Sequence, residues 1–209
     1  MFLYLIFITT LMAAKTKHAA VRKKRAPFIT WTPKQMSTIM DLTNKLVVNK
    51  ETGLLFVELY KHLCDVIPDN YVLHFYLGGH LFFAEKYAES LKVYEKAQKL
   101  NPKDPWIYNQ LGLGYALVGK FDKALANIEK GVKMDPSNTY IVSSHYEIYA
   151  LMNDYDKARE VLKKELKSGK IPLKKFCQGQ KDYLKSRFCQ DWEKKVLTHL
   201  VDDFCSSKI

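Results

Sequence analysis

Residues 105–138 read PWIYNQLGLGYALVGKFDKALANIEKGVKMDPSN, and this stretch decides the fold. Pro136, near its end, lies 34 residues after Pro102, which lies 34 residues after Pro68. Alignment on these prolines also brings small and aromatic residues into register: Leu77-Gly78 with Leu111-Gly112, Tyr87 with Phe121 and Tyr155, and Ala124 with Ala158. A fixed period of this length is the sequence signature of stacked structural repeats.

Each repeat is predicted to be a pair of antiparallel amphipathic helices, in units of residues 71–104, 105–138 and 139–172. Glu85-Lys86 and Gly119-Lys120 predict the turn inside a pair, and the Asn-Pro or Asp-Pro dipeptide ends its second helix because the residue before proline disfavours helical geometry. The small side chains of Gly112 and Ala124 allow the two helices to approach closely. One pair cannot bury its own apolar face, so the units must stack.

The period and these positions resemble the tetratricopeptide repeat family. The middle unit carries the resemblance most clearly, through Tyr108, Leu111, Gly112, Tyr115, Gly119, Phe121, Ala124, Gly131 and Pro136. The resemblance covers about half of the chain. It implies an all-α fold in which antiparallel helix pairs stack in a right-handed superhelix.

The remaining segments are expected to flank the three repeats of residues 71–172. Residues 31–70 have Tyr60 and Pro68 in register but depart from the family elsewhere, so we interpret them as a degenerate repeat or an N-terminal helical cap with its turn at Thr52-Gly53. Residues 173–209 are interpreted as a C-terminal capping region. Within it, apolar residues at spacings of three and four from about Lys181 to Phe204 predict one amphipathic helix of about six turns. A membrane-binding or calmodulin-target helix is the alternative for that segment.

Residues 1–30 combine an apolar leader, MFLYLIFITTLMAA, with a basic tail. Fourteen helical residues reach about 21 Å, less than the roughly 30 Å hydrocarbon core of a bilayer. A secretory signal or signal-anchor, a segment lying on a membrane surface, and a disordered tail or start-site artefact all remain open. The first two would bring this segment into contact with a membrane, which favours a membrane-associated or exported protein over a cytoplasmic one.

The formal net charge of +11 resides at two flanks rather than in the repeats. Residues 1–25 contribute +6, residues 163–195 contribute +7, and the stretch between them is close to neutral. The repeat body therefore lacks the basic face typical of a nucleic-acid-binding groove.

No arrangement of residues predicts catalysis, a metal or a cofactor. The glycines from Gly112 to Gly119 do not fit a dinucleotide loop, because Leu117 stands where its third glycine belongs and no strand precedes them. Ser143, Ser144 and His145 are contiguous in a predicted helix, where neighbours point in different directions. The histidines and cysteines show neither metal-protease spacing nor a Cys-x-x-Cys pattern. His80 is interpreted as a packed histidine.

Four cysteines allow three pairings. Within one predicted helix, Cys189 and Cys205 would lie about 24 Å apart, which excludes a bridge between them. Cys177 with Cys189 is the pairing we would test in an oxidising compartment. In the cytosol all four are expected to be reduced.

The family resemblance implies that the first helix of each unit lines a concave face and binds an extended peptide or a partner helix. At its inward positions this chain places Phe75, Tyr76, Trp106, Asn109, Gln110 and Tyr140, which we predict to bind the partner. The two lysines, two asparagines and one arginine with which some members clamp a carboxylate have no counterpart here. Phe82, Phe83 and Leu117 are interpreted as core.

The sequence therefore predicts a non-enzymatic scaffold or adaptor that holds a protein or peptide partner in an aromatic groove. A substrate-holding chaperone is a variant of this function. We expect no cofactor and no small-molecule substrate, and the neutral repeat body disfavours nucleic acid. The alternative is a basic binder of anionic membranes or nucleic acid that uses residues 15–25 and 163–195; a steep dependence of binding on salt would distinguish it.

Overall fold

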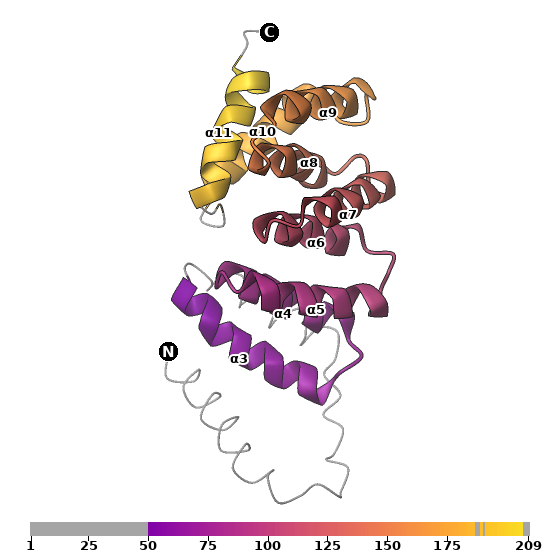
Figure 1. Cartoon of the computed structure of the whole chain (residues 1–209), viewed down its shortest axis with the longest axis vertical. Coiled ribbons are helices and arrows are strands. Elements are labelled where there is room, and N and C mark those ends of the chain that lie inside the picture. Colours follow the sequence, from indigo (N-terminus) through magenta and orange to yellow (C-terminus); the bar gives the residue numbers. More distant parts are fainter. Residues whose placement is uncertain (1–49, 187–188, 190, 207–209) are drawn as a thin grey trace, which may run out of the picture. The chain divides into compact units, whose positions relative to one another are not determined.

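The computed structural model describes residues 50–186, 189 and 191–206, all of which belong to one compact unit of residues 40–209. This described part is helical and contains no strand (Figure 1). Its helices are α3 (Lys50–Val66), α4 (Tyr71–Phe83), α5 (Tyr87–Leu100), α6 (Pro105–Leu117), α7 (Phe121–Met134), α8 (Thr139–Leu151), α9 (Tyr155–Lys167), α10 (Leu173–Leu184) and α11 (Asp191–Cys205). The three predicted repeats correspond to α4–α5, α6–α7 and α8–α9. The all-α repeat fold is confirmed.

The first helix of each repeat begins at a polar residue that caps it. The Asn70 and Asn138 side chains accept hydrogen bonds from the first backbone N–H groups of α4 and α8, and Asp104 accepts one from Trp106 N at 2.9 Å. These N–H groups have no partner inside the helix, so a side-chain oxygen at this position stabilises the helix start. The same type of N-cap thus fixes the equivalent first residue of α4, α6 and α8.

The turns within the repeats lie where the sequence predicts them. Gly119 adopts a φ of 74°, and Glu85 and Asn153 occupy the equivalent left-handed conformation with φ of 60° and 62°. Each of these residues comes two positions before the second helix of its repeat. The chain reverses there, so the two helices of a pair pack side by side.

Small residues set the distance between the paired helices. A Cβ atom at Gly78 would lie 2.7 Å from the ring of Tyr94, which is almost completely buried. In the same pair, Ser90 Oγ donates a hydrogen bond of 2.7 Å to the carbonyl of Gly78. At Gly112, a Cβ atom would approach the backbone of Ala124 to 3.3 Å. The register of Leu-Gly and Ala in the sequence thus reflects close helix packing.

The expectation of one C-terminal helix over residues 181–204 is wrong. The segment forms two helices, because α10 ends at Leu184 and α11 begins only at Asp191. The spacing of apolar residues continues across the break, since both helices turn an apolar face toward the last repeat. α8 contacts both helices, and Phe176, Leu197 and Leu200 are almost completely buried. The capping role is confirmed, but two antiparallel helices perform it.

The helix break also corrects the disulfide. Cys177 pairs with Cys205, with their Cα atoms 5.5 Å apart, whereas Cys64 and Cys189 are buried outside this bridge. The pairing put forward for testing, Cys177 with Cys189, is wrong, as is the single helix on which the exclusion of a bridge between Cys189 and Cys205 rests. Because α11 folds back along α10, the residue that returns to Cys177 is the last one of α11, and Cys189 lies in the turn.

Polar contacts fix α11 to the third repeat as well. Arg159 Nε on α9 donates a hydrogen bond of 2.8 Å to Asp203 Oδ2 on α11, and the hydroxyl of Tyr146 on α8 donates to the same oxygen at 3.3 Å. The partly buried Asp203 carboxylate therefore connects three helices.

At the other end of the described part, α3 packs against α4. The turn expected at Thr52-Gly53 is wrong, because α3 already begins at Lys50. Gly53 instead provides close contact: a Cβ atom there would lie 3.5 Å from the carbonyl oxygen of His80 and 3.6 Å from Phe83 Cβ.

Two expectations concern residues outside the described ranges. They are the apolar leader and basic tail of residues 1–30 and the first part of the helical pair in residues 31–70. Within the part of the chain that the structure describes, no helix is long and apolar enough to span a bilayer.

Candidate binding groove

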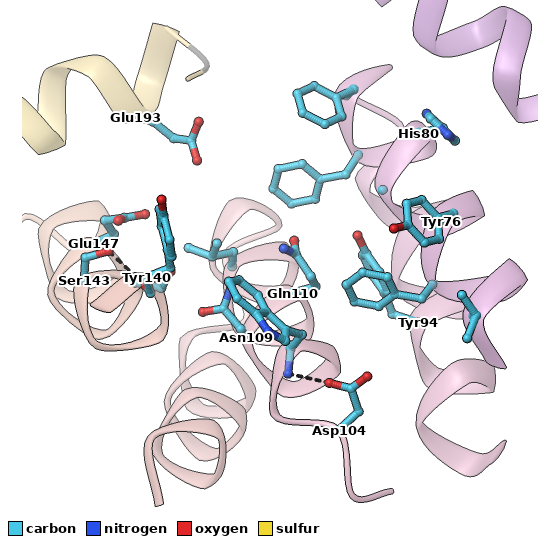
Figure 2. A pocket seen from close by; sticks show the side chains of 18 of the residues that line it. Tyr76, His80, Tyr94, Asp104, Asn109, Gln110, Tyr140, Ser143, Glu147 and Glu193 are labelled. Atoms are coloured by element: carbon cyan, nitrogen blue, oxygen red, sulfur yellow. Dashed lines mark hydrogen bonds between the residues drawn. The ribbon is translucent and has the colours of Figure 1, made fainter. Parts of the chain in front are cut away.

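A groove of about 930 Å³ runs across the inner helices α4, α6 and α8. We refer to the residues that line it as the groove: Tyr71, Val72, Phe75, Tyr76, Gly79, His80, Phe82, Phe83, Tyr94, Asp104, Trp106, Asn109, Gln110, Leu113, Tyr140, Ser143, Ser144, Glu147, Tyr183 and Glu193. Figure 2 shows Tyr76 and Tyr94 on one side, Asn109 and Gln110 between, and Tyr140 and Glu147 opposite. None of these lining residues is Lys or Arg.

All six residues that the sequence selected for partner binding line this groove. Phe75 and Tyr76 come from α4, Trp106, Asn109 and Gln110 from α6, and Tyr140 from α8. They lie in three successive repeats and share one concave surface, because the period of 34 residues returns each inner helix to the same orientation. Their role in binding a partner stays a prediction.

The α4 side of the groove is a cluster of aromatic rings. The Phe75 ring lies 5.9 Å from Tyr76, edge to face, and 5.6 Å from Tyr94 on α5, while Tyr76 stacks on Tyr60 of α3 at 5.9 Å. Such ring pairs restrict each other's orientation and add to the stability that burial provides. This side therefore offers a fixed apolar surface.

The α6 and α8 side presents exposed aromatic rings. The Trp106 and Tyr140 rings lie 6.0 Å apart, and Tyr140 meets Tyr183 of α10 edge to face at 5.8 Å. Trp106 remains 36% exposed and Tyr140 42%, whereas most large apolar side chains of the described repeats are buried. Large aromatic side chains exposed at neighbouring positions are typical of interaction surfaces.

A polar cluster occupies the end of the groove nearest α11. Glu147 on α8 and Glu193 on α11 are both buried, and the Tyr183 hydroxyl donates a hydrogen bond of 3.1 Å to Glu193 Oε1. Burial and the neighbouring charge of Glu193 raise the pKa of Glu147 to about 8, although the Ser143 hydroxyl nearby opposes the shift. Burial also raises the pKa of Tyr183 above its ordinary value, and Glu193 adds to this effect.

His80 is packed, as the sequence analysis expected. It is 3% exposed, and its ring lies 4.8 Å from that of Tyr60 and 5.4 Å from that of Phe56. Neither ring nitrogen has a hydrogen-bond partner among the described residues. Burial lowers the pKa of His80 to about 4, so the ring is neutral at physiological pH. Among the three residues interpreted as core, Phe82 is buried, while Phe83 and Leu117 are half-buried.

The sequence analysis did not select the polar end of the groove. Glu147 is the ninth residue of its repeat, counted from Thr139, and the equivalent residues of the two preceding repeats are Gly79 and Leu113. This register is the signal by which the acid could have been found. Glu193 and Tyr183 belong to the cap, which follows no repeat period. Their part in the groove could not be predicted from the spacing that identified the other residues.

Comparison with known proteins agrees with the repeat fold. The family profile described as TPR repeat matches residues 79–119, and the profile described as Tetratricopeptide repeat matches residues 107–138. Among curated protein sequences, none matches the chain significantly.

The fold is similar to that of solved structures of MamA. The structure of MamA 41-end from Desulfovibrio magneticus RS-1 is 19% identical, with a TM-score of 0.53 over 64% of this chain and 71% of that chain. The MamA RS-1 ArsTM double mutant gives a TM-score of 0.52 with the same identity and coverage. A further structure, MamA MSR-1 C2, is 22% identical with a TM-score of 0.47, and this chain covers 64% of its length.

These matches and the observed helix pairs define the class of the repeats: residues 79–138 contain tetratricopeptide repeats. Arrays of these repeats are scaffolds for protein–protein interaction and are generally not enzymes. The MamA likeness supports the fold alone.

Proposed function

We propose that the chain holds an extended segment of a partner protein in the groove, with Phe75, Tyr76, Trp106, Asn109, Gln110 and Tyr140 as the principal contacts. One observation carries this proposal. Three successive repeats each direct aromatic or amide side chains to the same concave surface, and two of the aromatic rings, those of Trp106 and Tyr140, remain exposed.

The residue types suit an extended peptide. Trp and Tyr bury a large apolar area with few rotatable bonds, which makes them frequent anchors at interfaces. The amides of Asn109 and Gln110 lie between the two aromatic sides and can hydrogen-bond to a bound backbone (Figure 2). A chaperone that holds a segment of its substrate would use the same contacts.

Random decapeptides displayed on phage and selected against the full chain provide a probe whatever the identity of the partner. Dissociation constants of the selected peptides are then measured by fluorescence anisotropy. The double variant Trp106→Ala with Tyr140→Ala should weaken binding by about tenfold to a hundredfold, because truncation of each ring is expected to cost about 1 kcal/mol of binding free energy. Circular dichroism should show unchanged helical content, because neither side chain belongs to the buried core.

Met134→Ala is the matched control. Met134 ends the outer helix α7, is as exposed as Trp106 at 36%, and does not line the groove. Its replacement should leave the dissociation constant within about twofold of the wild type, since surface substitutions outside an interface cost little. Equal loss of affinity in the control and the double variant would contradict binding in the groove, as would wild-type affinity in the double variant.

A further inference from the structure

The ninth residue of each repeat, counted from Tyr71, Pro105 and Thr139, indicates a more specific ligand. This position faces the groove in all three repeats and holds Gly79, Leu113 and Glu147 in turn. Gly79 and Leu113 leave an apolar surface, whereas Glu147 places a carboxyl group inside the groove with a side chain only 3% exposed. Neither repeat packing nor helix capping requires an acid here.

Burial makes this carboxyl group costly for the folded chain. A buried carboxylate loses its hydration, and that cost is offset only when a cation or sufficient hydrogen bonds replace the water. The Ser143 hydroxyl nearby favours ionisation of Glu147 but donates its own hydrogen bond of 2.9 Å to the carbonyl of Tyr140, while the negative charge of Glu193 acts against ionisation. The free protein therefore keeps Glu147 in an environment that a positive charge would relieve.

A second polar side chain in the lining of the groove has an atom with no hydrogen-bond partner among the described residues. Asn109 on α6 is 2% exposed, and its Oδ1 atom accepts no hydrogen bond from any described residue. Asn109 lines the same groove as Tyr140 and Glu147 of α8, and Figure 2 shows it between these residues and Tyr76 and Tyr94. A buried carbonyl oxygen without a donor is uncommon in folded proteins and costs stability. Asn109 and Glu147 thus contribute two buried oxygen acceptors to the lining of the groove.

We propose that this end of the groove binds a cationic side chain, Lys or Arg, of the partner segment. The Glu147 carboxylate and Asn109 Oδ1 accept hydrogen bonds from its N–H groups, and Glu193 adds negative charge beside them. The aromatic side of the groove binds apolar residues of the same segment. The proposal rests on the function proposed above and specifies the chemistry of the partner: an apolar or aromatic segment that carries a basic residue.

The positive net charge of the chain means that overall electrostatic attraction cannot explain a preference for basic peptides. At +11, the protein as a whole repels cationic peptides and attracts acidic ones. Non-specific electrostatic attraction would therefore enrich acidic peptides. Selection of a basic residue at one position therefore requires a local site, and the loss of this selection in Glu147→Gln distinguishes an acidic site from cation–π contact with the exposed rings.

Binding of the cation is coupled to ionisation of Glu147. The titratable and polar side chains around this group come from four elements and the turn before α11: Ser143 and Tyr140 on α8, Asn109 on α6, Tyr183 on α10, Cys189 in the turn and Glu193 on α11. Tyr183 and Cys189 have raised pKa values and stay neutral near pH 7. A bound cation lowers the pKa of Glu147, so binding releases a proton and strengthens as the pH rises through about 8.

The same phage-displayed decapeptides test the proposal on the full chain, the Glu147→Gln variant and the control Glu129→Gln. Glu129 is an exposed carboxylate on the outer helix α7. Wild type and control should enrich peptides that combine apolar or aromatic residues with Lys or Arg at one position. Glu147→Gln should still select apolar peptides but lose the basic residue.

A synthetic pair of peptides makes the test quantitative. For a selected peptide, replacement of the basic residue by norleucine should weaken binding to the wild type and the control about tenfold to a hundredfold, the range expected for hydrogen bonds to a charged group. For Glu147→Gln the two peptides should bind within about threefold of each other. Calorimetry in buffers of different ionisation enthalpy should show proton release with the wild type and the control but not with Glu147→Gln.

Other outcomes separate this proposal from the one on which it rests. Apolar peptides enriched by the wild type without a basic residue would contradict the cation site and leave the groove function intact. Failure to enrich any groove-dependent peptide would contradict both.

Discussion

At the scale of single residues, the buried ionisable side chains are the most informative feature of this protein. His80 and His145 are both buried, and burial lowers the pKa of each to about 4. Burial also raises the pKa of Glu147, to about 8. These groups have opposite effects on stability. As the pH falls from 6.5 to 4, the unfolded chain binds protons at the histidines that the folded chain does not bind, so stability is lost. As the pH rises from 4.5 to 8, Glu147 reduces stability.

His80→Leu isolates one of these contributions. In the wild type, His80 should remove about 2 kcal/mol of unfolding free energy between pH 7.5 and pH 5, whereas leucine cannot be protonated. The stability of the variant relative to wild type should therefore increase by about that amount over this range, and the effect of Glu147 cancels in the comparison. Urea unfolding at several pH values measures it. If the free energies of unfolding of the two proteins change in parallel with pH, His80 is not buried in its neutral form.

Groove residues that occupy equivalent positions of successive repeats could be predicted from the sequence, whereas groove residues outside the repeats could not. Phe75, Trp106 and Tyr140 were selected because each occupies an inward position of its repeat, and all three line the groove. The partner of a buried acid depends on which side chains meet across the fold. Glu193 reaches Glu147 from the cap, and no spacing in the sequence connects these two residues.

At the scale of elements, the C-terminal cap shows where periodicity misleads. Apolar residues recur at helical spacing from Lys181 to Phe204, yet the chain leaves the helix after Leu184 and re-enters it at Asp191. Both helices pack against α8, so each has an apolar face and the pattern continues across the turn. The pairing of Cys177 with Cys205 follows from the reversal and could not be inferred without it.

The disulfide is expected to stabilise the cap. It closes a segment of 28 residues, for which loop-closure entropy gives about 3–4 kcal/mol relative to the reduced chain. Cys177→Ser with Cys205→Ser should therefore lower the free energy of unfolding by up to this amount, measured in urea without reductant. Addition of reductant should destabilise the wild type and leave the variant unchanged. Equal stability of the oxidised wild type and the variant would show that α10 and α11 are held by packing and the Asp203 contacts alone.

At the scale of the whole molecule, the excess positive charge and the groove lie in different parts of the chain. The +11 net charge lies at residues 1–25 and 163–195, whereas the groove of the described repeats is aromatic and carries two buried acids. A polyanion bound by the basic flanks would lose affinity steeply with salt, because each phosphate contact releases counterions. A peptide enclosed by the groove makes its charged contact in a buried place, where salt screens less. The dependence of affinity on salt therefore distinguishes binding at the basic flanks from binding in the groove.

Hydrogen–deuterium exchange with a selected peptide tests the central claim most directly. The groove function predicts slower exchange, on peptide addition, in α4, α6 and α8, whose side chains line the groove, with little change in the outer helices α5, α7 and α9. The Trp106→Ala, Tyr140→Ala double variant should show no such protection at the same peptide concentration. Protection confined to the outer helices or to residues 163–195 would contradict the account, because the partner would then bind outside the concave surface.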